Sequence, residues 1–166
     1  MTVEYLDFAD FVAIAQAVTD LDLQTVMNVT NVDLADSALH APAAGFDDED
    51  FYPDFVDKAA VLLVRLNRNH PLPDGNKRAA WVSLRLFIDI NAWTWDPYPS
   101  VDDAEAAVLA VASGDWDEAA TASEHATRPR VDRAPQPPHR RPAGRATSAT
   151  VSRFRGTLRS RSGYTQ

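Results

Sequence analysis

Hydrophobic residues recur along most of the chain at the three- and four-residue spacing of amphipathic helices, rather than at the alternating spacing of strands. One stripe spans about four turns and comprises Tyr5, Phe8, Phe11, Val12, Ala15 and Val18. A second, short helix is predicted from Asn31 to His40. No hairpin turn separates two alternating segments, so the pattern predicts a helical body.

Two strongly apolar helices are predicted in the middle of the chain, on either side of a polar loop. The segment Ala41 to Asp54 contains two prolines, a glycine and four consecutive acids, and is expected to be a loop. A helix should follow from about Phe55 to Arg68 and end before Pro71, because a residue that precedes proline disfavours the helical conformation. The next helix is predicted to start with Asn76 as its N-cap and to continue through AAWVSLRLFIDI.

Two capping boxes predict the remaining helices. Ser100 with Asp103, and Asp115 with Glu118, have the required spacing, and the second of these helices should end before Arg128. We find no internal repeat. The fold class expected from these elements is an all-α, compact bundle of about six helices.

Charge divides the chain near Thr127. Of its 166 residues, 1–127 hold 23 acidic and 6 basic side chains, whereas 128–166 hold 1 and 10. The second part is rich in Arg, Pro, Ser and Thr and poor in large apolar residues, which is typical of disorder. We therefore predict a folded domain at 1–127 and a disordered tail at 128–166, either a solvated appendage or a basic segment that binds nucleic acid.

The absence of cysteine excludes disulfide scaffolds, thiolate zinc sites and cysteine nucleophiles. The N-terminus is acidic rather than basic, and no apolar run approaches the roughly 18 residues of a membrane-spanning helix. The expected location is the cytoplasm, with no membrane partner.

The run HPLPDGNKR, residues 70–78, places a histidine, a carboxylate, a glycine, an amide and two cations in nine positions. Lys77 and Arg78 fall in the first helical turn, where the positive end of the helix dipole favours acids. Stability alone does not select cations there. A phosphate held by both cations and by the free N–H groups of the helix start would explain them.

The neighbouring residues suit the same chemistry. Gly75 allows close approach of the backbone to a phosphate, and Asn76 adds a hydrogen bond. Asp74 is the kind of single carboxylate that holds Mg²⁺ beside phosphates, and His70 can accept a proton from a hydroxyl. Taken singly, these residues also fit a Pro-Asp-Gly turn, a helix cap and a structural histidine, but their combination favours a site.

The run resembles the active-site motif of the Fic/Doc family, and the resemblance covers roughly residues 4–127. The matching positions are His70, Leu72, Asp74, Gly75, Asn76, Lys77 and Arg78. The resemblance implies a transferase that uses ATP and Mg²⁺. His70 would be the general base for a hydroxyl of a protein substrate, Asp74 would hold Mg²⁺, and Gly75, Asn76 and Arg78 would bind nucleotide phosphates.

Two positions depart from the usual family motif and bear on the reaction. Leu72 replaces a phenylalanine that anchors the loop, and Lys77 replaces the glycine of adenylylating members. With Lys77, the motif resembles that of the Doc branch, whose members are the toxins of toxin–antitoxin pairs. This implies transfer of the γ-phosphoryl group of ATP to Thr or Ser of elongation factor Tu, inhibition of translation, and an antitoxin supplied by another chain.

Two other functions stay open at this point. Gly75 is more typical of the Fic branch, which implies transfer of AMP to a protein hydroxyl. A hypothesis of another class is a non-catalytic helical binding module whose basic tail, 128–166, binds nucleic acid. The motif would then have no purpose, and no helix has a basic face.

The loop from Ala41 to Asp54 occupies the place where the family usually has a flap that aligns the target peptide. Its candidate docking residues are Phe46, Phe51 and Tyr52. The alternative interpretation is an acidic surface loop whose aromatic residues anchor it in the core.

Overall fold

The structure is a computed structural model, and it describes residues 2–95 and 98–124. In these ranges the elements are α1 (Phe8–Thr19), α2 (Leu23–Val29), α3 (Val32–His40), the 3₁₀ helix η1 (Ala41–Ala43), β1 (Gly45–Phe46), β2 (Glu49–Asp50), α4 (Phe55–Asn69), α5 (Asn76–Ile90), α6 (Val101–Ser113) and α7 (Glu118–Ser123). The predicted all-α class is confirmed. The helix α2 was not predicted, because it buries only Val26 and therefore has no apolar stripe.

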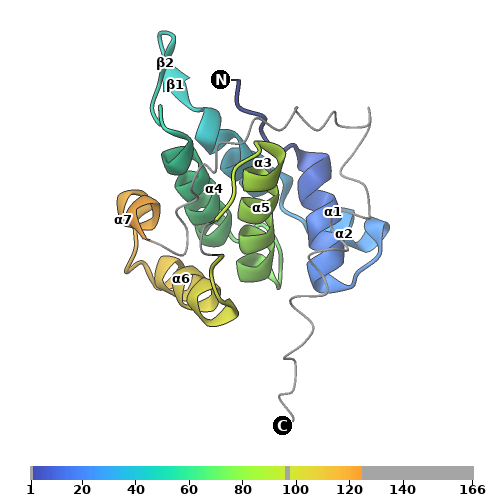
Figure 1. Cartoon of the computed structure of the whole chain (residues 1–166). Helices are drawn as coiled ribbons and strands as arrows, with labels where there is room; N and C mark the ends of the chain where they lie inside the picture. The colour runs from blue at the N-terminus through green and yellow to red at the C-terminus, as the bar shows by residue number, and fades with distance from the viewer. Residues whose placement is uncertain (1, 96–97, 125–166) are drawn as a thin grey trace.

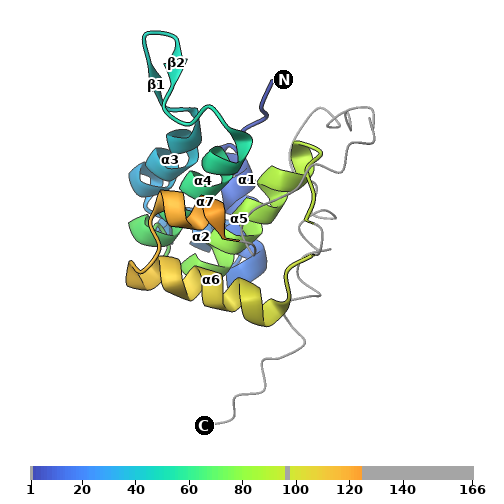
Figure 2. The same ribbon diagram turned by 60° about the vertical axis from the view of Figure 1, so that its left-hand side comes forward.

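The helices α4 and α5 form the centre of the molecule, as Figure 1 shows. The helices α1 and α3 pack on one side of this pair, with α2 against α1, and α6 and α7 pack on the other, as the turned view in Figure 2 also shows. Both central helices are buried over most of their length, as their apolar sequences predict. The short loop between them holds the motif, so its position is fixed from both sides.

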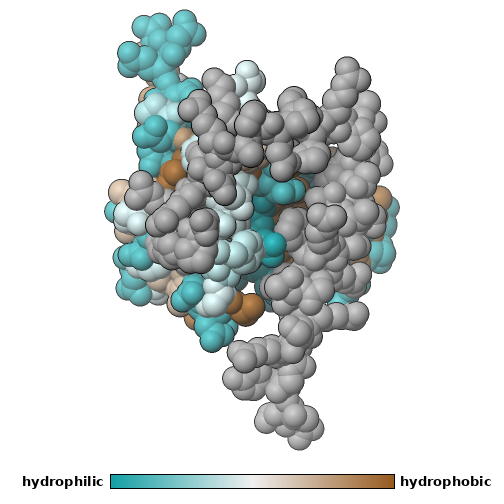
Figure 3. All heavy atoms as spheres, viewed as in Figure 1, coloured by the Kyte–Doolittle hydropathy of each residue, from teal (hydrophilic) through white to brown (hydrophobic). Residues whose placement is uncertain are grey.

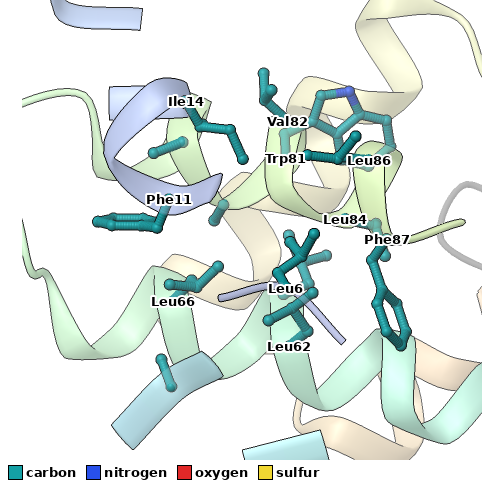
Figure 4. Close-up of a cluster of buried hydrophobic side chains, with 14 of the residues drawn as sticks. Leu6, Phe11, Ile14, Leu62, Leu66, Trp81, Val82, Leu84, Leu86 and Phe87 are labelled. Atoms are coloured by element: carbon teal, nitrogen blue, oxygen red, sulfur yellow. The ribbon is translucent and has the colours of Figure 1, made fainter. Parts of the chain in front are cut away.

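The core is a continuous cluster of side chains from α1, α4 and α5 (Figure 4). Its labelled members include Phe11, Ile14, Leu62, Leu66 and Phe87, all exposed by 1% or less. Close packing of such groups provides most of the favourable free energy of folding. The motif is thus carried on two helices that cannot shift without opening the core.

The far end of α5 is tied to the N-terminal segment by one buried amide. Asn91 accepts a hydrogen bond from the backbone N–H of Glu4 at 2.8 Å and donates to the carbonyl oxygens of Glu4 and Phe87, each at 2.8 Å. An aromatic stack of Phe55 on Phe87, with ring centroids 5.0 Å apart, lies at the same end. These contacts define the end of the molecule opposite the motif loop.

Two local predictions were wrong. The N-cap of α7 is Asp117, whose side chain accepts from the Ala120 N–H at 2.8 Å, and not Asp115, which accepts from the Ser113 hydroxyl. The segment predicted as a loop contains an antiparallel hairpin, β1–β2. Its strands are too short for alternation to be seen, and Asp47 and Asp48 form its turn with φ of 52° and 64°.

The predicted tail at 128–166 lies outside the described residues, so it stays a prediction. None of the helices in 2–95 and 98–124 has the length and apolarity that crossing a membrane requires.

Candidate functional site

His70 lies at the C-cap of α4 in the left-handed conformation, with φ 50° and ψ 57°. It therefore ends the helix one residue before Pro71, as predicted. Its side chain is exposed, and its Nδ1 lies 3.0 Å from the carbonyl oxygen of Arg68. Because a carbonyl can only accept, this contact assigns the proton of the neutral ring to Nδ1. Nε2 is then left with a lone pair directed away from that contact, as a general base requires.

The loop after His70 is held by buried backbone contacts. The Asn31 N–H donates to the Pro71 carbonyl at 2.8 Å, and Leu72 is only 4% exposed. Leu72 therefore fills the anchoring position that the family usually gives to phenylalanine. Asn31 was predicted only as a helix start, and no local signal in the sequence indicates its contact with a loop 40 residues away.

Asn76 has a different place from the one predicted. It is the first residue of α5, and Gly75 is the N-cap. The Asn76 side chain is buried, accepts from the Leu72 N–H at 2.9 Å and donates to the Leu72 carbonyl at 2.6 Å. Both polar ends of this amide thus hold the loop closed through Leu72.

The start of α5 offers unpaired N–H groups. The N–H of Ala79 bonds to the Gly75 carbonyl at 2.8 Å, whereas those of Asn76, Lys77 and Arg78 have no acceptor in the described part of the chain. Free N–H groups and the helix dipole together favour an anion at this position. This backbone geometry is of the kind that binds an anion, and the anion site itself stays a prediction.

The charged side chains around this helix start are accessible to a ligand. Asp74 and Arg78 have side-chain exposures of 93% and 50%, and the Asp74 Oδ2 lies 3.8 Å from the Arg78 Nη2. Lys77 is exposed and forms no ion pair with any described carboxylate, and the first turn of α5 contains no acid. The single carboxylate of Asp74 therefore does not neutralise the two cations, Lys77 and Arg78, at this helix start.

Gly75 has φ 81°, and a Cβ there would lie 3.3 Å from Thr19 Cγ2 and 3.5 Å from Arg78 Nη2. We expect Gly75→Ala to lower the free energy of unfolding by about 1–2 kcal/mol for the left-handed conformation, with a further loss from crowding. Gly114→Ala is the matched control, because Gly114 has φ 86° and open space around it. Urea unfolding of both variants measures the difference, and equal losses would contradict the crowding.

The donor set at this end of α5 fits Mg²⁺ rather than a metal held by protein ligands alone. In the described ranges no cluster of three His, Asp or Glu side chains can hold a metal. Asp74 nonetheless presents an exposed carboxylate beside an anion site, and Mg²⁺ is commonly bound by one carboxylate together with substrate phosphates.

The aromatic residues proposed as a docking flap are not near this loop. Phe46 lies in β1, and Phe51 and Tyr52 follow β2, so all three precede the N-terminus of α4, whereas His70 follows its C-terminus. A helix of this length separates its ends by roughly 20 Å, and Figure 1 shows the hairpin projecting from that far end. The alternative interpretation, that these aromatic residues anchor the loop in the core, is wrong for Phe46 and Phe51, which are 78% and 62% exposed.

A buried lysine fixes the base of this hairpin. Lys58 in α4 is 2% exposed, and its Nζ donates to the Pro42 carbonyl at 3.0 Å and to the Asp50 carboxylate at 2.7 Å. Burial alone would lower the pKa of Lys58, but the hydrogen bond to Asp50 and the nearby Tyr5 outweigh it, and the pKa is raised. Lys58 therefore stays charged at neutral pH and keeps Asp50 on the side that faces α4.

Comparison with known proteins agrees with this geometry. The model of the Fic/DOC family matches residues 5–88. The chain is also 38% identical over 121 residues to "Toxin Doc" of Mycolicibacterium smegmatis, an alignment that covers 73% of this chain and 90% of that toxin. No solved structure gave a significant match. The predicted resemblance is thereby confirmed, and the chain belongs to the Fic/Doc family.

Proposed function

We propose that this protein is a Doc-like toxin kinase that phosphorylates a Thr or Ser hydroxyl of elongation factor Tu, using ATP, and thereby inhibits translation. The observation that carries the proposal is Lys77. This lysine adds an exposed cation to the helix start, at a position where adenylylating relatives have glycine. The cation has no ionic partner among the described residues. The similarity to a protein named a Doc toxin supports the same branch.

The phosphates of ATP would be bound by the start of α5. The N–H groups of residues 76–78, which have no acceptor among the described residues, would bind the phosphate oxygens, and Lys77 and Arg78 add two full charges. Such fixed donors stabilise the charge on the equatorial oxygens of the transferred group. Asn76 contributes by holding the loop closed through Leu72, and Gly75 by adopting the left-handed conformation that begins α5 beside Thr19 and Arg78.

Proton transfer is assigned to His70. Its Nε2 accepts the proton of the target hydroxyl while that oxygen forms a bond to the γ-phosphorus, and the bond from the γ-phosphorus to the β–γ bridging oxygen breaks. The products are a phosphorylated hydroxyl, ADP and a protonated His70, which returns its proton to solvent. The carbonyl of Arg68 keeps the ring oriented throughout, because it can pair with Nδ1–H in both protonation states.

Asp74 is the residue that would hold Mg²⁺. When bound, the metal supplies neutralisation of the phosphate charge, and the exposed carboxylate beside the anion site suits that role.

Gly75 supports a second candidate, transfer of AMP. If ATP binds in the other direction, the same hydroxyl attacks the α-phosphorus and pyrophosphate leaves. His70 would still accept the proton and the start of α5 would still bind phosphate, so the direction in which ATP binds decides which group is transferred.

As a Doc-like toxin, this protein would be controlled by an antitoxin on another chain. The name of the similar M. smegmatis protein supports such a partner. The antitoxin would act by covering the exposed His70, Asp74 and Lys77 side chains.

Intact-protein mass spectrometry of elongation factor Tu, after incubation with this protein, Mg²⁺ and ATP, tests the proposal. We expect a mass gain of one phosphate with ADP as the other product. A gain of one AMP with release of pyrophosphate would assign the protein to the adenylylating branch. An unmodified factor would reject elongation factor Tu as the target.

A further inference from the structure

One face of the hairpin carries two aromatic rings and a carboxylate. Phe46 pairs with Glu49, and the Phe51 N–H donates to the Ala44 carbonyl at 2.9 Å, which extends the ladder by one pair. Since alternate residues of a strand share a face, Phe46, Glu49 and Phe51 lie on the same side. All three are exposed. Figure 3 shows the hydrophilic end of the hairpin standing clear of the body.

The other face of the hairpin is already occupied. Asp50 lies on it and is bonded to the buried Lys58, which also holds the Pro42 carbonyl. A hairpin with only two residues in each strand has little stability of its own. The link to Lys58 therefore sets its orientation and leaves the Phe46, Glu49 and Phe51 face toward solvent.

The chemistry of this face suits arginine. A guanidinium group stacks on aromatic rings and pairs with a carboxylate at the same time, which an ammonium group does less well. The turn residues Asp47 and Asp48 add negative charge, and the hairpin itself contains no basic residue. We propose that the Phe46, Glu49 and Phe51 face of the hairpin binds arginine side chains of this chain's own segment 128–166.

Charge and tethering select that segment. It has ten arginines and one acid, whereas residues 1–127 have four arginines in all. It also follows α7, which packs against α4, the helix that holds the hairpin. A covalent tether gives an effective concentration of about millimolar, so weak contacts suffice for binding. The surface is distinct from the candidate site at the far end of α4, and the inference does not depend on the proposed reaction.

The absence of cysteine allows a direct test. A nitroxide spin label on Ser152→Cys in the full-length chain broadens the backbone amide signals of residues that its segment approaches. We expect strong broadening at residues 44–51 and little at α2. Glu49→Gln should reduce it about threefold, because it removes the carboxylate of an exposed ion pair. Asp48→Asn is the matched control, since it removes the same charge from the same hairpin outside this face, and it should leave the broadening nearly unchanged.

Three outcomes would overturn the inference. Absence of broadening at 44–51 would show that the segment does not bind there. Equal effects of Glu49→Gln and Asp48→Asn on the broadening would show that only general attraction between opposite charges brings the segment to the hairpin. The third outcome comes from a mixture of two proteins, one with the spin label but without ¹⁵N, the other with ¹⁵N but without the spin label. Broadening of the ¹⁵N-labelled protein's signals at 44–51 would assign the face to the segment of a second copy.

Discussion

Replacing His70 by alanine is expected to lower the rate of target modification by about 10²–10⁴-fold, the usual contribution of a general base. The ring is exposed at the end of α4, so the free energy of unfolding should change little. Its hydrogen bond to the Arg68 carbonyl spans only two residues, so it orients the ring and fixes its tautomer rather than the fold. Initial rates from intact-mass measurements and urea unfolding of the same sample separate the two effects.

His40 provides the matched control for this substitution. It is also exposed at the end of a helix, and its Nδ1 lies 2.9 Å from a backbone carbonyl, that of Asp36. His40→Ala should therefore modify the target at the wild-type rate. A His70→Ala protein as active as His40→Ala would remove His70 from the mechanism.

Asn76→Ala is expected to reduce both stability and activity. The variant loses the two hydrogen bonds to Leu72 and leaves that buried N–H and carbonyl without their side-chain partner. The expected loss in free energy of unfolding is about 2–3 kcal/mol. Activity should fall by about 100-fold, because small displacements of groups that hold a reacting phosphate are costly. Unfolding in urea and initial rates well below the melting temperature measure the two losses.

Asn91 allows the structural and functional parts of this loss to be separated. It is a buried asparagine at the opposite end of α5, with hydrogen bonds to Glu4 and Phe87. Asn91→Ala should lose a similar free energy of unfolding yet keep the wild-type rate, because the motif loop is untouched. Equal activities of Asn76→Ala and Asn91→Ala would contradict a role of Asn76 in shaping the site.

Local sequence predicted the central part of the fold well. The helix expected from Phe55 to Arg68 extends by one residue, to Asn69, and the capping box at Ser100 and Asp103 begins α6 as expected. These features depend on residues within a few positions of one another, on apolar periodicity, on proline and on cap chemistry. The same locality predicted the candidate site at residues 70–78, since one short segment, the loop and the first turn of α5, contains all of its groups.

Other features depended on residues far apart in the chain. The motif loop is tied to Asn31 by a backbone hydrogen bond, and Gly75, the N-cap of α5, lies beside Thr19 of α1. The hairpin similarly takes its position from Lys58. The family resemblance suggested a docking flap for its aromatic residues, whereas the structure places the hairpin before the N-terminus of α4.

The sequence by itself thus determined the helical class, the two central helices, the family and the residues of the motif, because each is written in short-range patterns. Only the tertiary structure decided the position and the hydrogen-bond partners of each motif residue. It directed the Asn76 amide into the loop and placed the hairpin at the far end of α4. It also left the N–H groups at the start of α5 without an acceptor in the described part of the chain. The physical reason is that hydrogen-bond partners and burial are set by chain segments that meet only after folding.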